Sequence, residues 1–226
     1  MLLYYITDRR QFPGDETARR CGLLDKIAEA AASGVDFIQL REKDLSAREL
    51  ESLAQAAVQI VREGWNSSQQ KTRTRLLINS RLDVAIASGA DGVHLRSDDV
   101  SVKDVREIWK SAGNPLESSP LVSVSCHTTA EVAQAALGGA DFVVFAPVFE
   151  KKDMPQAVPA GLKVLQEACR KKIPVFALGG VNLENAHSCI EAGAAGIAGI
   201  RFFQQRGITE TVNFLRTIGL RTKSTR

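Results

Sequence analysis

The sequence predicts an α/β protein with a (β/α)8 barrel, the TIM-barrel fold. One pattern returns four times, as SGVDFIQL from Ser33, SGADGVHL from Ser88, GGADFVVF from Gly138 and EAGAAGIAGI from Glu191. Each copy follows an Ala-rich amphipathic stretch and leads into a β-prone run, which indicates a helix that ends just before a strand. Four further apolar runs alternate with these copies and bring the predicted strands to eight.

These elements follow one another along the chain as βα units. The four further strands are predicted in LLYYITD near the start, LLINS from Leu76, LVSVSCH from Leu121 and PVFALGG from Pro174. The clearest helical patterns are SARELESLAQAAVQIVREG, RLDVAIASG, SVKDVREIWKSAG, TTAEVAQAALGG and GLKVLQEACRKK. Three of these helices begin with a capping box or near-box, formed by Ser46 with Glu49, Ser101 with Asp104, and Thr128 with Glu131.

The size and number of the units favour a closed barrel. Eight βα units of this kind are typical of a barrel of about 250 residues. A shared glycine, at Gly34, Gly89, Gly139 and Gly193, suits the end of a helix before each strand. An open doubly wound sheet is the alternative, because alternation of strands and helices does not by itself show closure.

Composition narrows the class of protein. Of the 226 residues, 44% are hydrophobic and 24% charged, as in a soluble globular protein. We expect one barrel domain over residues 1–218 and a basic tail over 219–226. The 29 Lys and Arg barely exceed the 26 Asp and Glu, so nothing indicates a nucleic-acid partner, although a local anionic ligand fits.

The sequence also bears on location and assembly. No segment approaches the roughly 20 apolar residues that span a bilayer, and the N-terminus lacks the pattern of a signal peptide. We therefore expect a cytoplasmic protein that contacts no membrane. The four cysteines have no metal-ligand spacing and are expected to be small, mostly buried hydrophobes. Homo-oligomerisation is left open by the helix patterns.

Polar residues at the carboxyl ends of the strands are the candidates for chemistry, since barrels carry their active sites there. In FIQLREK, side-chain alternation puts Gln39, Arg41 and Lys43 on one face. An amide and two cations could together hold a phosphate or diphosphate. The alternative is an ion-pair network inside the barrel.

A second anion site is predicted after the seventh and eighth strands, the usual phosphate site of the fold. Gly179 and Gly180 let backbone N–H groups approach an anion closely, and Asn182 can cap the following helix. Arg201 adds charge at the same rim, unless it pairs with a carboxylate.

Acidic and imidazole side chains complete the candidate set. Asp98 and Asp99 follow the fourth strand, where carboxylates beside a diphosphate suggest Mg2+; capping of the next helix is the alternative. His127 ends the fifth strand as a candidate general acid or base, or as a capping or core residue. His94 lies within a strand and is expected to be a hydrogen-bonded interior residue.

The motifs, taken in order, resemble a known family. They are YYITDR, FIQLREKDLSARE, LLINSRLDVAIASGADGVHL, VSVSCHT, GADFVVFAPVF and PVFALGGVNLENAHSCIEAGAAGIA. From about Leu3 to Phe203 the chain is similar to the thiamine phosphate synthase family and its close relative, the thiazole tautomerase.

The resemblance implies a barrel that joins hydroxymethylpyrimidine diphosphate to a thiazole phosphate in a Mg2+-dependent reaction and releases diphosphate. It implies contacts to the pyrimidine diphosphate from Gln39, Arg41, Lys43, Asn79 and Ser125, a Mg2+ ligand in Asp99, and a backbone contact to the thiazole phosphate from Gly180. The expected partners are therefore small phosphorylated molecules.

Three positions depart from the synthase pattern. Ser80 stands where that pattern has a second Mg2+-binding Asp, and Arg201 replaces a small residue. EKKDMPQ occupies the place of a Thr-x-Thr-Lys loop, where Lys151 or Lys152 could restore the charge.

We favour the synthase. The alternatives are a tautomerase with His127 as its acid or base, suggested by the phrase VFE at 148–150, and a non-catalytic sensor of phosphate ligands.

Overall fold

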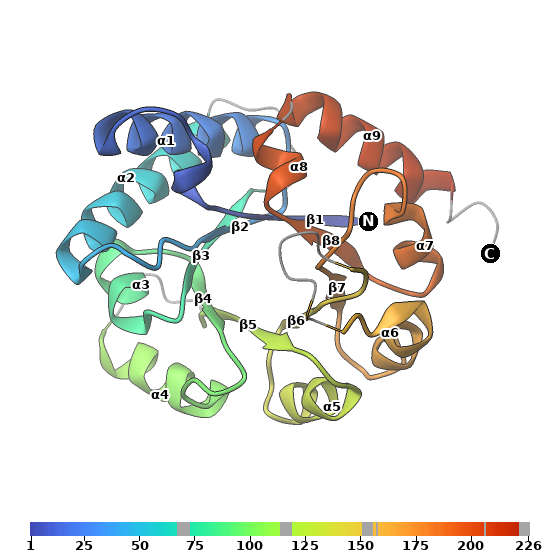
Figure 1. Ribbon diagram of the computed structural model, residues 1–226. Helices are drawn as coiled ribbons and strands as arrows, with labels where there is room; N and C mark the ends of the chain where they lie inside the picture. Colours follow the sequence, from blue (N-terminus) through green and yellow to red (C-terminus); the bar gives the residue numbers. More distant parts are fainter. Residues whose placement is uncertain (67–72, 114–118, 151–155, 157, 206, 222–226) are drawn as a thin grey trace.

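The predicted barrel is confirmed by the computed structural model, in which eight parallel strands of the described residues form one closed sheet in the order β1 to β8 (Figure 1). The structure describes all residues except 67–72, 114–118, 151–155, 157, 206 and 222–226. Strand β1 pairs with both β2 and β8. This double pairing closes the sheet and excludes the open doubly wound alternative.

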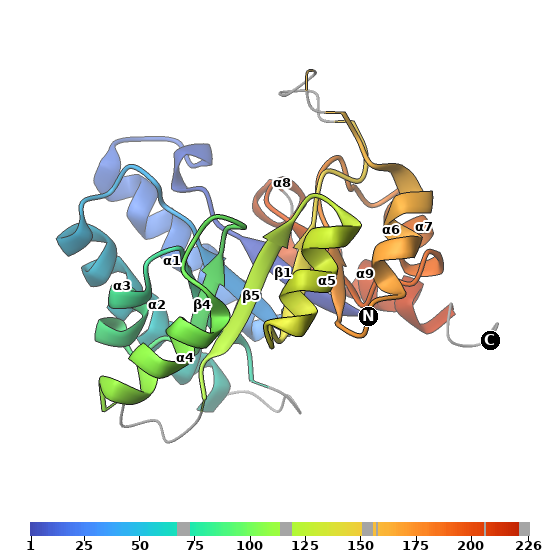
Figure 2. The ribbon, with the colours of Figure 1, turned by 90° about the horizontal axis from the view of Figure 1, so that it is seen from below.

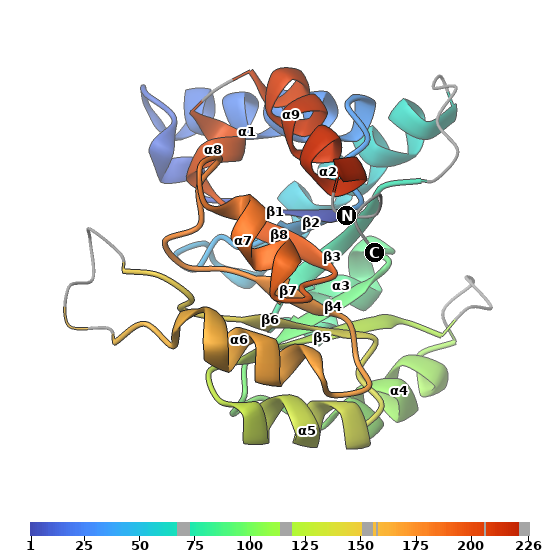
Figure 3. The same cartoon turned by 90° about the vertical axis from the view of Figure 1, so that its right-hand side faces the viewer.

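Helices alternate with the strands and surround them. The strands are β1 Leu2–Ile6, β2 Phe37–Leu40, β3 Arg75–Asn79, β4 Gly92–Leu95, β5 Leu121–Cys126, β6 Phe142–Phe145, β7 Val175–Ala177 and β8 Gly196–Gly199. The helices are η1 Arg9–Gln11, α1 Glu16–Ala32, α2 Ala47–Asn66, α3 Leu82–Ser88, α4 Val102–Ser111, α5 Thr129–Leu137, α6 Gly161–Cys169, α7 Ala186–Glu191, α8 Arg201–Gln204 and α9 Ile208–Arg221. Figure 3 shows α5 beside α6 and α1 near α9.

The helix ends follow the local sequence signals. Thr128 and Glu131 form a complete capping box at the start of α5. The side chain of Ser101 caps α4. Ser46, just before α2, donates its backbone N–H to the Glu49 side chain, and its hydroxyl accepts from the backbone N–H of Glu49. At the other ends, the four predicted glycines all have positive φ, from +68° to +101°, a conformation that glycine adopts without steric cost.

Apolar side chains lie in two places, inside the barrel and between the sheet and the helices. Ile38 and Leu40 are fully buried in the outer core, among helix residues such as Leu53. Gln39, between them in sequence, points into the barrel, where its side chain meets Tyr4. The alternation predicted for FIQLREK is therefore confirmed within the strand, which ends at Leu40.

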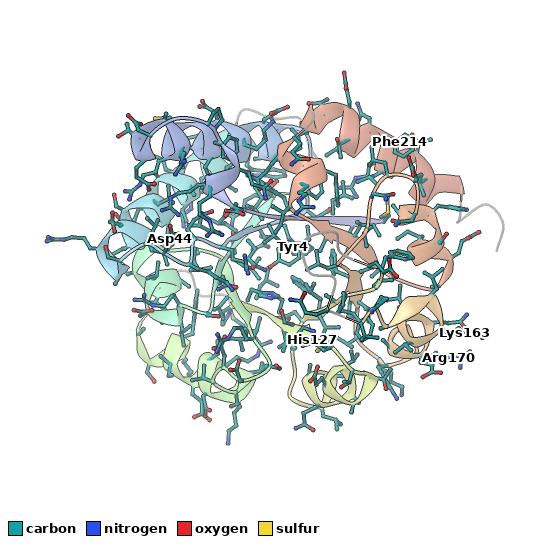
Figure 4. All side chains as sticks on the ribbon, viewed as in Figure 1. Tyr4, Asp44, His127, Lys163, Arg170 and Phe214 are labelled. Atoms are coloured by element: carbon teal, nitrogen blue, oxygen red, sulfur yellow. The ribbon has the colours of Figure 1, made fainter. Side chains whose placement is uncertain are left out.

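An aromatic layer fills the amino-terminal half of the barrel. Phe37 and Phe142 each begin a strand, and their ring centroids lie 4.8 Å apart. Tyr4 and Phe176 pack against both of them, with Tyr4 near the barrel axis (Figure 4). This layer closes the interior below, so the polar residues later in each strand face the carboxyl-terminal mouth. Figure 2 shows β5 running toward that mouth and α8 near it.

The last helix extends further than expected. Helix α9 runs to Arg221, so the boundary of the predicted basic tail at residue 219 lies inside the helix, and 222–226 are outside the described residues. None of the helices in the described part of the chain combines the length and apolar character needed to cross a membrane.

Candidate active site

The loop after β2 is tied to the end of β1 by Thr7. Its hydroxyl donates to Oε1 of Glu42 at 2.6 Å and accepts from the backbone N–H of Arg41 at 2.9 Å. Both Thr7 and Glu42 are buried. The backbone of Arg41 is therefore fixed by two strands, which restricts the directions its side chain can take.

A buried arginine, Arg9, also holds the β2–α2 loop in place through its contacts with carboxylates. The guanidinium of Arg9 forks onto Asp44 at 2.7 and 3.0 Å, donates to Glu16 at 2.8 Å and reaches Glu42 at 3.2 Å. The Arg9 side chain is only 4% exposed. Bidentate Arg–carboxylate contacts fix geometry as well as charge, so Arg9 joins η1, α1 and the β2–α2 loop into one rigid unit.

Arg41 and Lys43 lack this kind of pairing. Burial lowers the pKa of Arg41, more than the carboxylates of Asp8 and Glu42 offset, and the charge of Arg41 lowers the pKa of Lys43. Neither side chain forms an ion pair with a carboxylate of the described residues, so the interior ion-pair alternative is wrong for these two and applies to Arg9 instead. Two neighbouring cations without a direct ion pair to a carboxylate of the described residues favour an anionic ligand.

Polar side chains line the barrel between the aromatic layer and the mouth. Gln39 Nε2 donates to the hydroxyl of Tyr4 at 3.0 Å. The ring nitrogens of His94 lie 2.7 Å from Oγ of Ser123 and 2.9 Å from Oγ of Ser125. Burial lowers the pKa of His94 to about 3, with a smaller effect from Arg41, so the ring is neutral at neutral pH. The expectation of a hydrogen-bonded interior histidine is confirmed.

Asp99 holds the start of the β3–α3 connection. Its Oδ2 accepts from the Ser80 hydroxyl and from the backbone N–H of Arg96, both at 2.7 Å. The side chain that caps α4 is Ser101, so the capping alternative for Asp98 and Asp99 is wrong. Asp98 is exposed and pairs with the guanidinium of Arg96 at 2.8 Å.

Asn79 is the last residue of β3, and Ser80 follows it beside the carboxylate of Asp99. Asn79 Nδ2 lies 3.4 Å from Oγ of Ser80, and Ser80 has a φ of +57°. Such a φ is uncommon for a residue with a Cβ atom, and strained conformations of this kind cluster at functional sites. Asp99, Ser80 and Asn79 therefore form one hydrogen-bonded group at the mouth, next to the polar layer.

Gly180 needs to be glycine for steric reasons. Its φ is +67°, and a Cβ there would lie 2.4 Å from the carbonyl oxygen of Glu150. The side chain of Asn182 accepts from the N–H groups of Glu184 and Asn185, so it caps a turn, whereas helix α7 begins only at Ala186. Asn182 therefore does not cap the helix directly, as the sequence had suggested.

The remaining candidates lie around the rim or outside the described residues. Arg201 is exposed at the start of α8, next to the end of β8. His127 lies exposed just after β5 (Figure 4), and its Nδ1 donates to the carbonyl oxygen of Ala146 at 2.7 Å. Lys151 and Lys152 are outside the described residues.

Sequence reasoning missed the residues that support the site. Tyr4 holds Gln39, Ser123 holds His94 and Arg9 holds the loop, yet none of the three was a candidate. Strand register could have indicated Ser123, because it lies opposite His94 and two residues before Ser125. Arg9 carried no signal beyond its position after the first strand.

Known proteins are similar to this chain along most of its length. A family model described as thiamine monophosphate synthase matches residues 3–203. The chain belongs to this family. Among relatives, a Geobacter sulfurreducens protein whose provisional name is thiamine-phosphate synthase is 40% identical over 87% of this chain and 83% of its own. The thiamine-phosphate synthase of Roseiflexus sp. is 36% identical over 87% of this chain and 75% of its own.

A solved structure agrees with this assignment. The thiamine phosphate pyrophosphorylase of Pyrococcus furiosus superposes with a TM-score of 0.76 and 30% identity, covering 96% of this chain and 94% of its own. The resemblance read from the motifs, which ended at Phe203, is thereby confirmed. The family match ends at the same residue, before α9.

Proposed function

We propose that the protein is a thiamine-phosphate synthase, which joins hydroxymethylpyrimidine diphosphate to thiazole phosphate and releases diphosphate in thiamine biosynthesis. The observation that carries this proposal is the pair of cations at the mouth of the barrel, Arg41 and Lys43, which form no ion pair with a carboxylate in the described part of the chain. The names of the family and of its relatives support the same reaction.

The chemistry requires positioning and charge, and no nucleophilic side chain. The bond between the pyrimidine methylene carbon and the diphosphate oxygen breaks, and its electron pair leaves with the diphosphate. Arg41 and Lys43 stabilise the negative charge that grows on the leaving oxygens. The thiazole nitrogen donates its lone pair to the methylene carbon, and the barrel holds the two substrates within reach of each other.

Gln39, Asn79 and Ser125 bind the same substrate in this proposal. Gln39 is fixed by Tyr4, and Ser125 by His94, so each of the two side chains is held in a defined direction. The thiazole phosphate would bind on the opposite side, at the N–H groups near Gly180, with Arg201 supplying charge. Lys151 keeps its predicted role as a further cation.

The residues present fit Mg2+ as a cofactor carried mainly by the substrate. Within the described residues, no group of three His, Cys, Asp or Glu side chains is placed to hold a metal ion. Asp99 offers one carboxylate, whose Oδ1 lies 3.7 Å from the guanidinium of Arg96. Magnesium is commonly bound by one or two carboxylates together with phosphates and water. It would add positive charge beside the departing diphosphate, with Asp99 as its protein ligand.

A thiazole tautomerase is the second candidate, favoured by His127. The contact between Nδ1 and the Ala146 carbonyl leaves Nε2 free to accept a proton. Tautomerisation requires such a group and no diphosphate site, so it leaves the pairing of Arg41 with Lys43 unexplained.

Assays of the purified protein with both sets of substrates test the two candidates. We expect thiamine phosphate to form with Mg2+, and Arg41→Ala to lower kcat/KM by at least about 100-fold because it removes a charge beside the leaving group. Arg48→Ala is the matched control, since Arg48 is exposed on α2, seven residues away. Robust turnover by Arg41→Ala would refute the role given to Arg41.

The second reaction is followed in parallel. Interconversion of thiazole phosphate carboxylate isomers without metal, lost in His127→Ala, would identify a tautomerase. Binding of phosphorylated ligands with neither reaction would identify a sensor.

A further inference from the structure

Three side chains form a chain of hydrogen bonds inside the barrel, next to a hydrogen-bonded pair. In the pair, Gln39 donates to the Tyr4 hydroxyl at 3.0 Å, and the Tyr4 ring lies 6.1 Å from that of His94. In the chain, Ser123 meets Nδ1 of His94 at 2.7 Å, and Nε2 of His94 meets Ser125 at 2.9 Å. The chain ends at Ser125, given a substrate contact above, but Ser123 and His94 have no assigned role.

The burial of Ser123 gives this chain one direction. The Ser123 side chain is fully buried, and among the described residues Nδ1 of His94 is the hydrogen-bond partner of its hydroxyl. An unsatisfied buried donor is costly. The hydrogen of the Ser123 hydroxyl therefore points to Nδ1 of His94.

The state of the imidazole follows from its acceptor role at Nδ1. A neutral imidazole carries one hydrogen, and Nδ1 accepts one here, so the hydrogen of His94 lies on Nε2. Nε2 then donates to Ser125 Oγ. Because His94 is 4% exposed and contacts hydroxyl groups at both nitrogens, the surroundings favour the neutral ring.

This direction decides what Ser125 can offer to a ligand. If Nε2 lacked a hydrogen, the Ser125 hydroxyl would donate to it and present only lone pairs to the mouth, which repel an anion. With Nε2–H as the donor, the Ser125 hydroxyl keeps its own hydrogen for an anionic oxygen, and such charge-assisted hydrogen bonds are the stronger kind.

We propose that His94 is a positioning residue, which through its Nε2–H tautomer sets the Ser125 hydroxyl as a donor to the diphosphate group of the substrate. Ser123 fixes that tautomer from the other side of the ring. The identity of the anion rests on the proposed function, whereas the direction of the hydrogen bonds does not.

Two substitutions at His94 separate the two ring nitrogens. The amide of Gln extends to about the place of Nε2 and can still donate to Ser125, while that of Asn ends near Nδ1 and leaves Ser125 without a donor. With inorganic diphosphate and Mg2+ as the titrated ligand, we expect His94→Asn to weaken binding by about tenfold or more, and His94→Gln by less than about threefold. Equal weakening by both variants would overturn the proposal.

A double-mutant cycle tests whether His94 acts through Ser125. In the Ser125→Ala background, His94→Asn should weaken diphosphate binding no further, because the hydroxyl that it orients is already gone. If the two effects multiply instead, His94 acts by another route and the proposal is wrong. In turnover, the effect should fall on the KM for the pyrimidine substrate.

The tautomer itself can be observed in the wild-type protein, whatever the variants do to folding. Long-range 1H–15N NMR spectra should show His94 with a protonated Nε2 and a bare Nδ1 at neutral pH, and Ser123→Ala should reduce that preference, because it removes the donor to Nδ1. The opposite tautomer would overturn the inference even in an active enzyme. Conversely, a protein that binds diphosphate with this tautomer but makes no thiamine phosphate would refute the proposed function alone.

Discussion

The hydroxyl of Ser80 donates a hydrogen bond of 2.7 Å to the carboxylate of Asp99. The same carboxylate oxygen accepts from the backbone of Arg96, and the Arg96 guanidinium lies 3.7 Å from the other oxygen. Asp99 is therefore surrounded by donors and a cation rather than by a second acid. This surrounding lowers the attraction for a divalent cation, since affinity rises with the number of charged ligands.

Replacing Ser80 by Asp should strengthen Mg2+ binding. The left-handed backbone at Ser80, with φ +57°, is one that Asp tolerates better than most residues. We expect the Mg2+ concentration for half-maximal activity to fall by roughly tenfold, because a second carboxylate then faces the metal. Titration of Mg2+ against initial rate measures this change.

The thermal stability of the Ser80 variants without Mg2+ provides the control for this prediction. Two adjacent carboxylates repel, so Ser80→Asp should melt at a lower temperature than the wild type without Mg2+ and recover when Mg2+ is added. Ser80→Ala removes the hydrogen bond without adding charge and should show no such recovery. An unchanged Mg2+ requirement in Ser80→Asp would place the metal away from this group.

Removing the Arg9 side chain should destabilise the fold. Arg9→Met keeps the length of the side chain but leaves Glu42 buried without its cation, and we expect a loss of about 3 kcal/mol in the free energy of unfolding. Arg10→Met is the control, since the neighbouring Arg10 is exposed and pairs only with Asp8 among the residues described, so that its loss should stay below about 1 kcal/mol. Urea denaturation measures both, and equal losses would contradict the role of Arg9.

The ionisation of Glu42 should leave a pH signature in stability. Burial raises the pKa of Glu42 above its ordinary 4.5, more than the hydrogen bonds from Thr7 and Arg9 lower it. The folded state therefore binds this proton more tightly than the unfolded chain, and the resulting stability is present below pH 4.5 and lost as the pH rises through the raised pKa.

Glu42→Gln is the non-titrating reference for that signature. We expect the free energy of unfolding of the wild type, measured relative to Glu42→Gln, to fall between about pH 4 and pH 7. Urea denaturation of both proteins across this interval gives the difference. A difference that rises with pH would mean that the partners of Glu42 outweigh its burial.

Local sequence signals were sufficient to predict the strands and helices, because each signal is a property of a short segment. The repeated Gly before every second strand and the box of Thr128 with Glu131 act within one turn, and the structure has both where they were expected. Whether the sheet closes depends on β1 meeting β8 across nearly the whole chain, and here the number of units and the resemblance were decisive.

The site was only partly predictable, because its support comes from residues distant in sequence. Strand alternation placed Gln39 on the inner face, but the partner that fixes it, Tyr4, lies 35 residues earlier. His94 was expected inside, yet its contact with Ser125 spans 31 residues and arises only when β4 and β5 pair. Composition and residue spacing do not predict such contacts between strands.

Adding a methyl group at Gly180 should act on both stability and the thiazole phosphate. The Cβ of Gly180→Ala would meet the Glu150 carbonyl oxygen at 2.4 Å, at a φ of +67° that already disfavours alanine. Gly139→Ala is the matched control, because Gly139 has a φ of +81° and open space around the added Cβ. Backbone strain alone should cost Gly139→Ala about 1 kcal/mol of unfolding free energy.

Gly180→Ala should lower the free energy of unfolding by more than Gly139→Ala does. The backbone shift that relieves the contact of its Cβ with the Glu150 carbonyl should also raise the KM for thiazole phosphate by about tenfold or more. The KM for the pyrimidine substrate should stay within about threefold, since that substrate is proposed to bind across the barrel at Arg41 and Lys43. Steady-state kinetics with each substrate varied in turn measures both constants. If the pyrimidine KM rose instead, the two substrates would have to exchange places, because the strain at Gly180 acts on the β7–α7 loop and not on the loop after β2.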